Sequence, residues 1–400
     1  MRKRLLLLLS ILLSFSLLAA ACGDDDDEGT DAEDTSDEGT DAEDDGDTTD
    51  DEGDMAEGDG TAVKACLVTD LAGIDDKSFN ATAWKGVTDA IENGDALPEG
   101  PDGSFYLESD TEADWQPNID QMVSQGCEHI VTVGFALDGV TQANAPSNPD
   151  IDWTIVDVDF VEFDEEGNFV GDIAYDNVRE LTYQTDEAAF LAGYVAASVT
   201  QSGVVGTFGG ANFPTVSIFM DGFYWGVEHY NETKGTDVQV LGWDPANPDT
   251  GLFTGDFVDL DIARNTAQSL LDEGADVIMP VGGQINLGAA AAMEDLGMGA
   301  SGDTFGALIG VDTDAFFSAP EQADLWLTSV EKAMDLTVAE SIAASAAGEF
   351  ESGVVRGFLS NGGVGISPYH EFEDIVTDET KAEVEQLEQD IIDGTLVVGG

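Results

Sequence analysis

The sequence predicts an α/β fold of two similar lobes, each a doubly wound sandwich of parallel strands and helices, with a cleft between them. From residue 62 onward, short runs rich in β-branched residues alternate with stretches whose apolar residues are spaced by three and four. This alternation is typical of parallel α/β layers. Two such series occur, one on each side of about residue 180, so we expect two lobes rather than one.

Each element follows from its local pattern. Strands are expected at the short apolar, β-branched runs 63–69, 104–107, 130–134, 153–158, 203–208, 238–241, 277–281 and 307–311. Helices are expected at the amphipathic stretches 78–92, 115–125, 186–199, 214–230, 259–272, 287–295 and 331–346. Open parallel sheets bind ligands where strands end and helices begin. The loops after the strands are therefore the places to look for a site.

The first residues predict secretion and a lipid anchor. Three basic residues at 2–4, an apolar run at 5–18 and a small-residue cleavage site give residues 1–21 the anatomy of a signal peptide. The run is shorter than the ~20 residues of a membrane-spanning helix. Its end, LAAAC, resembles the bacterial lipobox, whose cysteine is lipidated; an ordinary secretion signal is the alternative. We expect Cys22 to hold the protein on the extracytoplasmic face of the cell membrane.

The segment at 22–61 is predicted to be a disordered tether. Between residues 23 and 60 it has 21 acidic side chains and no lysine, arginine or aromatic residue. Such a segment buries too little apolar surface to offset chain entropy. A dedicated cation or partner site is the alternative.

The charge balance excludes several partners. The chain has 83 acidic against 12 basic residues, and about −53 of its formal charge of −71 lies beyond residue 60. Nucleic acid is excluded because its phosphates need Lys and Arg. A surface that docks electrostatically on anionic lipid is excluded for the same reason.

So acidic a surface predicts that folding depends on salt. Carboxylate repulsion destabilises a compact state and salt screens it, so a halophilic or marine source is our hypothesis. Far-UV circular dichroism of the domain at 62–400 should lose amplitude when salt is withdrawn and regain it when salt is restored. Identical spectra at low and high salt would count against the hypothesis.

Cysteine usage points away from metal binding. Besides Cys22, the chain has only Cys66 and Cys127, both in or beside apolar strand-like runs. In an oxidising location, one disulfide and two buried thiols both remain open. Since the spacing is not that of a metal site, we expect neither a metal nor a cofactor.

The loop after the first strand carries candidate ligand-binding residues. Asp70 ends the strand, and Ser78, Phe79 and Asn80 follow a glycine turn. They offer hydrogen-bond acceptors, a helix cap and a stacking ring. The alternatives are that Ser78 and Asp76 only cap a helix and that Phe79 belongs to the core.

Later loops repeat the pattern of glycine, carboxylate and aromatic residue. Glycines let the backbone approach a ligand, and ionised carboxylates accept hydrogen bonds from sugar hydroxyls. Lys332 opens the predicted late helix, with a surface ion pair as the alternative. These loops supply Asp138, Phe219, Gly282, Gly283, Asp312 and Lys332.

The ordered set of segments resembles the basic membrane protein family, also called the PnrA-like nucleoside-binding lipoproteins, which are substrate-binding components of ABC importers. The segments are 69–80 (TDLAGIDDKSFN), 134–138 (GFALD), 187–193 (EAAFLAG), 206–210 (GTFGG), 276–283 (DVIMPVGG), 309–314 (IGVDTD) and 361–365 (NGGVG). The resemblance covers the chain from about residue 62 to 400. It implies a type I periplasmic-binding-protein fold, two Rossmann-like lobes joined by three hinge crossovers.

The resemblance also implies how the chain is divided and what it does. Lobe 1 would comprise 62–178 and 330–352, and lobe 2 would comprise 179–329 and 353–400. The protein would be a monomer that binds a nucleoside, in particular a purine nucleoside, in the cleft and serves an ABC permease. No catalysis is implied.

Site roles carry over residue by residue. The base would lie between Phe79 and Phe219, although the loop at 211–214 departs from the family pattern, so Phe213 or Phe223 could supply the second ring. Asp312 and Lys332 would hold the ribose hydroxyls. The remaining contacts to base edge, sugar or second-lobe wall would come from Asp70, Ser78, Asn80, Asp138, Gly282 and Gly283.

Other functions have weaker support in the sequence. A secreted nucleoside hydrolase is disfavoured because no GxSxG elbow occurs and because His129, His229 and His370 lie in no triad or metal spacing. Asp157 and Asp159 lack the pattern of a calcium loop, so we interpret them as solvated strand-end residues. A binder or sensor for another small polar ligand, such as a sugar, remains the main alternative.

Overall fold

The computed structural model describes residues 60–163 and 169–399. The predicted signal peptide, Cys22 and nearly all of the predicted tether lie outside these residues. Within the described part of the chain, no helix is both long and apolar enough to cross a membrane.

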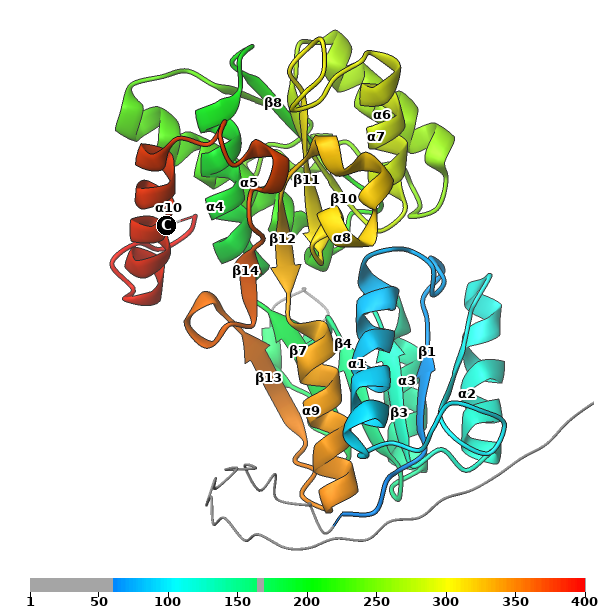
Figure 1. Cartoon of the computed structure of the whole chain (residues 1–400). Helices are drawn as coiled ribbons and strands as arrows, with labels where there is room; N and C mark the ends of the chain where they lie inside the picture. Colours follow the sequence, from blue (N-terminus) through cyan, green and yellow to red (C-terminus); the bar gives the residue numbers. More distant parts are fainter. Residues whose placement is uncertain (1–59, 164–168, 400) are drawn as a thin grey trace, which may run out of the picture. The chain divides into compact units, whose positions relative to one another are not determined.

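Two six-stranded sheets form the two lobes (Figure 1). The first runs in the order β13 (Gly353–Gly357), β7 (Val178–Tyr183), β4 (Asp152–Val156), β3 (His129–Val133), β1 (Ala65–Val68), β2 (Phe105–Leu107). The second runs β14 (Val364–Ile366), β12 (Trp326–Lys332), β11 (Ala307–Asp312), β10 (Val277–Val281), β8 (Val204–Gly209), β9 (Gln239–Leu241). The order is the same in both sheets, and β14 alone among the described strands of these sheets pairs antiparallel. The predicted fold is confirmed.

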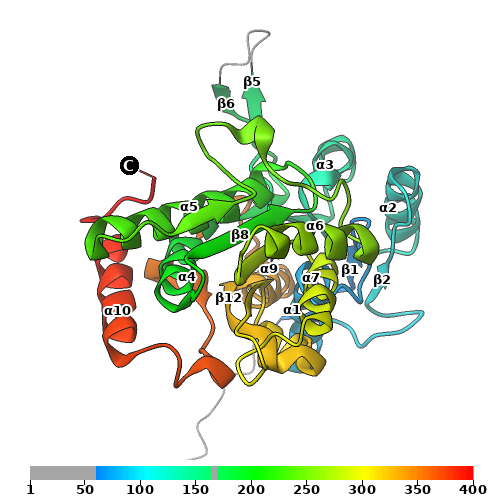
Figure 2. The ribbon, with the colours of Figure 1, turned by 90° about the horizontal axis from the view of Figure 1, so that it is seen from above.

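Helices cover both faces of each sheet (Figures 1 and 2). On the first sheet, α1 (Phe79–Asn93) and α9 (Met334–Ala347) pack on one face, and α2 (Trp115–Ser124) and α3 (Asp138–Asn144) on the other. On the second, α4 (Thr185–Val199), α5 (Pro214–Lys234) and α10 (Asp378–Ile392) lie opposite α6 (Leu260–Asp272) and α7 (Ile285–Asp295). The short α8 (Ala315–Ser318) lies beside β12. The largest apolar cluster runs from α1 and α9 into α4 and α5, so the lobes share a core.

Close packing of α4 on α5 explains glycines in both helices. A Cβ at Gly193 would lie 2.2 Å from the carbonyl oxygen of Phe223, and one at Gly226 would lie 2.0 Å from that of Phe190. Any larger residue at either position would push the helices apart.

Three short crossovers join the lobes. Gln184 links β7 to α4, Ala333 links β12 to α9, and residues 358–363 link β13 to β14. Hydrogen bonds connect the crossovers. The backbone amide of Gln184 donates to the carbonyl of Gly357 at 2.8 Å, and the backbone amide of Ala333 donates to the carbonyl of Gly363 at 3.0 Å. A Cβ at Gly363 would lie 2.2 Å from the Cα of Gly357, so this contact requires glycine.

Strand pairing in the two sheets places the lobe boundaries at residues that differ from the predicted ones. Boundaries at 179, 330 and 353 would divide β7 and β12 and would assign β13 to lobe 2. Pairing places all of β7 and β13 in the first sheet and all of β12 in the second. The chain therefore passes from one lobe to the other near residues 184, 333 and 358, where the paired strands end.

The predicted helix at 331–346 begins later than expected. Lys332 is the last residue of β12, because Val330–Lys332 pair with β14, and α9 starts at Met334. The hairpin of β5 (Val161–Phe163) and β6 (Phe169–Asp172) was also not predicted; it projects from the rest of the domain in Figure 2.

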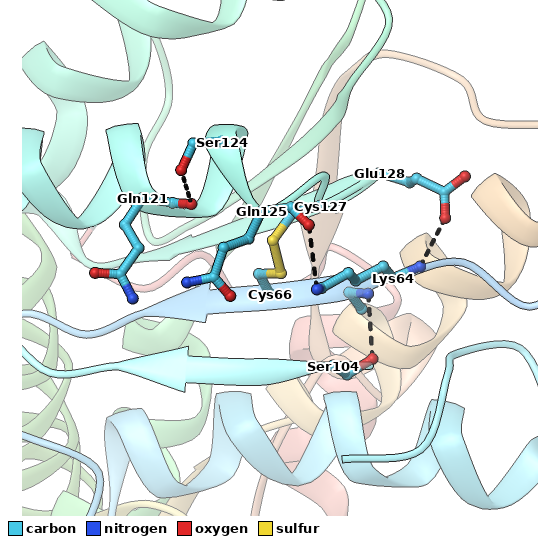
Figure 3. Close-up of a disulfide and its surroundings, with 9 residues drawn as sticks. Lys64, Cys66, Ser104, Gln121, Ser124, Gln125, Cys127 and Glu128 are labelled. Atoms are coloured by element: carbon cyan, nitrogen blue, oxygen red, sulfur yellow. Dashed lines mark hydrogen bonds between the residues drawn. A yellow bond between two sulfur atoms is a disulfide. The ribbon is translucent and has the colours of Figure 1, made fainter. Parts of the chain in front are cut away.

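Cys66 and Cys127 form a disulfide, which resolves the alternatives left open by the sequence. Their Cα atoms are 6.0 Å apart, and both residues are buried in the apolar cluster beneath α2 and α3. Figure 3 shows the bridge joining β1 to the residue after the α2 turn, beside Lys64, whose Nζ donates to the carbonyl of Gln125 at 3.2 Å. The bridge therefore closes a loop that spans α1, β2 and α2.

Candidate ligand-binding site

A cavity of about 350 Å³ lies between the two lobes. Its walls come from segments that follow β1, β2, β3 and β4 in the first lobe and β8, β9, β10 and β11 in the second. The volume falls within the ~300–1,000 Å³ of small-molecule sites. Seven of the predicted site residues line it: Asp70, Phe79, Phe219, Gly282, Gly283, Asp312 and Lys332.

The other three predicted residues do not line the cavity. Asp138 begins α3 and is half-buried outside it. Ser78 is buried, with its hydroxyl 2.8 Å from a carboxylate oxygen of Asp312 and 2.9 Å from the carbonyl of Val311. Ser78 therefore joins the lobes behind the site, and its side chain does not cap α1.

Asn80 and Asp76 together position Asp70. The Asn80 amide donates to Asp70 at 2.7 Å and to Asp76 at 3.1 Å. Asp76 caps α1, as one alternative from the sequence proposed, by accepting from the backbone amides of Ser78, Asn80 and Ala81. Burial raises the pKa of Asp76 to about 6, although these amides act in the opposite direction. Burial likewise raises the pKa of Asp70.

Lys332 forms the floor of the cavity as part of a buried ion triad. Its Nζ donates to Asp157 at 2.6 Å and lies 3.3 Å from Asp312, and the Lys332 side chain is only 2% exposed. Burial alone would lower the pKa of Lys332, but the two carboxylates outweigh burial and raise it. Lys332 is thus a charged group fixed between two acceptors.

The two carboxylates occupy equivalent places in the two lobes. Asp157 follows β4 and Asp312 ends β11, and both strands are fourth in their sheet's chain order. Both residues have left-handed backbones, with φ of 63° and 70°. Non-glycine residues rarely adopt this conformation, and aspartate tolerates it better than most. Backbone strain of this kind often accompanies functional sites.

Aromatic rings stand on both sides of Lys332. The ammonium is 5.3 Å from the ring centroid of Phe79 in lobe 1 and 4.7 Å from that of Phe219 in lobe 2. Of the alternatives for the second ring, Phe213 also lines the cavity, whereas Phe223 is fully buried away from it. Phe79 and Phe219 are therefore the pair nearest the charged floor.

Several cavity residues were not proposed as site residues from the sequence. Asp157 was interpreted as a solvated strand-end residue, but it is buried against Lys332. Its position near the end of the predicted strand 153–158 was the signal that could have found it. Phe257 lies in the loop before α6, far from any strand end, and no sequence signal points to it. The set comprises Asp76, Trp115, Phe135, Asp157 and Phe257.

His129 and Asp159 have structural roles. His129 bonds Thr154 at 2.9 Å, and burial lowers its pKa to about 3. Asp159 pairs with Arg356 at 2.7 Å rather than acting together with Asp157. Among the described residues, no group of three or more His, Cys, Asp or Glu side chains is arranged to hold a metal.

The family follows from comparison with known proteins. A family model described as ABC transporter substrate-binding protein PnrA-like matches residues 63–400. The chain belongs to this family. Proteins of this kind bind the substrate of an ABC transporter outside the cytoplasm and work with a membrane permease; they are not enzymes.

Individual relatives agree with the family and the fold. The chain is 29% identical to the CD4+ T-cell-stimulating antigen of Listeria monocytogenes, over 83% of this chain and 87% of that protein. It is 28% identical to the ABC transporter nucleoside-binding protein BmpA of Lactococcus lactis, over 84% of this chain and 89% of that protein. An ABC transporter solute-binding protein of Aeropyrum pernix K1 has the same fold, with a TM-score of 0.69, 23% identity and coverage of 84% and 93%.

Proposed function

We propose that this protein is a lipid-anchored receptor that captures nucleosides, in particular purine nucleosides, between its lobes and presents them to the permease. The cavity carries the proposal, because Phe79 and Phe219 flank a floor made of Lys332 and the Asp312 carboxylate. A relative named as a nucleoside-binding protein supports it. The predicted lipid anchor at Cys22 and the monomeric state belong to the same proposal.

The arrangement suits a flat base attached to a polyhydroxylated sugar. Stacking on an aromatic ring is worth ~1–3 kcal/mol per base and tolerates different bases. Asp312 and Lys332 offer an acceptor and a donor to vicinal ribose hydroxyls. At the other side, Asp70 is held by Asn80 and offers an acceptor to a base N–H.

The charge of the cavity favours nucleosides over nucleotides. Its lining includes seven carboxylates, and Lys332 is its only basic residue among the described part of the chain. Because Lys332 is already paired with Asp157 and Asp312, a phosphate would meet net negative charge and be repelled. Adenosine and guanosine should therefore bind, and their 5′-monophosphates should not.

Ligand binding would also favour the closed arrangement. The lobes already touch through Ser78 and Asp312 and through Gln284, whose side-chain amide donates to the carbonyl of Ala72 at 3.2 Å. A ligand that contacts both walls stabilises closure by its differential affinity for the closed state. The closed form is what we propose the permease recognises.

Loss of the stacking ring or of the floor carboxylate should abolish nucleoside binding. Calorimetry with adenosine and guanosine should show heat for the wild type and none for Phe79→Ala or Asp312→Ala. Asp312→Asn is a useful second variant, because asparagine tolerates the left-handed backbone at this position. Phe317, which is 71% exposed on α8, gives the matched control Phe317→Ala.

The outcomes of this experiment separate the alternatives. Circular dichroism must show that each variant is folded. Near wild-type affinity in both Phe79→Ala and Asp312→Ala would remove the assigned site. Release of free base and ribose would identify a hydrolase, and binding of a sugar but no nucleoside would favour the sugar receptor.

A further inference from the structure

Three aromatic rings meet across the lobes at the open side of the cavity. Phe135 follows β3 in lobe 1, and its ring centroid lies 5.4 Å from that of Phe213, which precedes α5 in lobe 2. Phe213 lies in turn 6.1 Å from Phe257. Such distances are those of interacting aromatic pairs.

Phe135 lies at the mouth of the cavity rather than at its floor. Phe135 is 36% exposed, and two other lining residues, Leu71 and Val258, are more than 40% exposed. Lys332 and Asp312 at the floor are buried. Phe135 is therefore separate from the pair that flanks Lys332.

The lobe 2 half of the contact is held firmly. A Cβ at Gly210 would lie 2.3 Å from the ring of Phe257, and one at Gly282 would lie 2.7 Å from the same ring. Phe257 thus packs against two backbone segments that only glycine leaves open. Phe213 is placed by Pro214, the first residue of α5.

We propose that Phe135, Phe213 and Phe257 form an interlobe clasp that sets how long a bound nucleoside stays in the cavity. The inference rests on the proposed function for the identity of the ligand. Because Phe135 and Phe213 belong to different lobes, their contact exists only in the closed state and must break before the ligand leaves. The clasp therefore slows dissociation and leaves association nearly unchanged.

The test measures dissociation of tritiated adenosine and tritiated guanosine after a chase with the unlabelled nucleoside. Phe135→Ala should dissociate about three- to tenfold faster than the wild type, the range expected for loss of one aromatic pair, with association within about twofold. Phe135→Tyr keeps the ring and should behave as the wild type. Phe317→Ala again serves as the control, since its ring lies outside the cavity lining.

A double variant distinguishes a clasp from two independent contacts. If Phe135 acts through Phe213, then Phe135→Ala combined with Phe213→Ala should dissociate no faster than Phe213→Ala alone. An unchanged dissociation rate in Phe135→Ala, a change confined to association, or fully additive effects would each overturn the clasp.

A second measurement needs no ligand. Amide hydrogen exchange in peptides that contain Phe213 should be faster in ligand-free Phe135→Ala than in the ligand-free wild type, because Phe213 loses its contact across the lobes. Faster exchange in a protein that binds neither nucleoside would reject the proposed ligand and retain the closure contact. Unchanged exchange in such a protein would reject the clasp as well.

Discussion

Replacing Lys332 with methionine should lower the free energy of unfolding by about 3–5 kcal/mol. Methionine has a similar length but no charge, so Asp157 and Asp312 would be left facing each other. Both carboxylates are buried, with side chains 7% and 6% exposed, so two charges would lose their only basic partner. Urea unfolding followed by circular dichroism measures the effect.

An exposed ion pair gives the matched control. Lys381 lies 2.6 Å from Glu373, whose side chain is 60% exposed, so Lys381→Met should cost only about 0–1 kcal/mol. Adding Asp157→Asn and Asp312→Asn to Lys332→Met should restore much of the lost stability, since no buried charge then lacks a partner. If Lys332→Met were as stable as Lys381→Met, the buried triad would not have the importance assigned to it.

The regular parts of the fold could be predicted because local patterning suffices for them. All eight predicted strands occur in the structure, with ends that differ by at most two residues. The missed strands lack a continuous apolar run. In β7, Arg179 and Glu180 interrupt the pattern, and Glu180 is buried because it accepts from the backbone amide of Phe160 at 2.7 Å. That partner is not visible in the sequence.

The strands next to the crossovers, β13 and the end of β12, were missed for a different reason. In β13, Val354 and Val355 are exposed at the edge of the first sheet, so burial does not select their pattern. β11 pairs with β12 as far as Glu331, and Lys332, the last residue of β12, pairs only with Val364 of β14, more than thirty residues further along the chain. Long-range pairing of this kind overrides local preference.

Cavity residues that directly follow a strand could be predicted from the sequence. Cavity residues in loops that fold back over the site could not. The rule that ligands bind at the carboxyl ends of strands located Asp70, Asp312 and the glycines at 282 and 283, all of which line the cavity. The rule also covers Asp157, but in so acidic a chain nothing marks one strand-end aspartate as buried. Its partner Lys332 was noticed in the sequence, but its role in binding came only from the family resemblance.

Removing the disulfide should have the second large effect on stability. The bridge joins residues that are 61 positions apart, and closing a loop of that length in the unfolded chain is worth about 4 kcal/mol in the chain-entropy model. The double variant Cys66→Ala, Cys127→Ala should therefore unfold at a clearly lower urea concentration than the oxidised wild type. Two small side chains in the cluster around Ile119 and Met122 would add a packing loss of the same sign.

Adding a reductant distinguishes the stabilisation by the disulfide from the stabilisation by packing of the two side chains. Fully reduced wild type keeps both sulfur atoms but loses the link, so its midpoint should fall toward that of the double variant, which should not respond to reductant. The loop lies wholly within lobe 1, since it spans α1, β2 and α2. Hydrogen exchange should accordingly increase first in lobe 1 peptides, while the sheet of lobe 2 keeps its protection. Equal loss of protection in both lobes would show that they unfold as one unit through the shared core, and an unchanged midpoint on reduction would contradict a stabilising bridge.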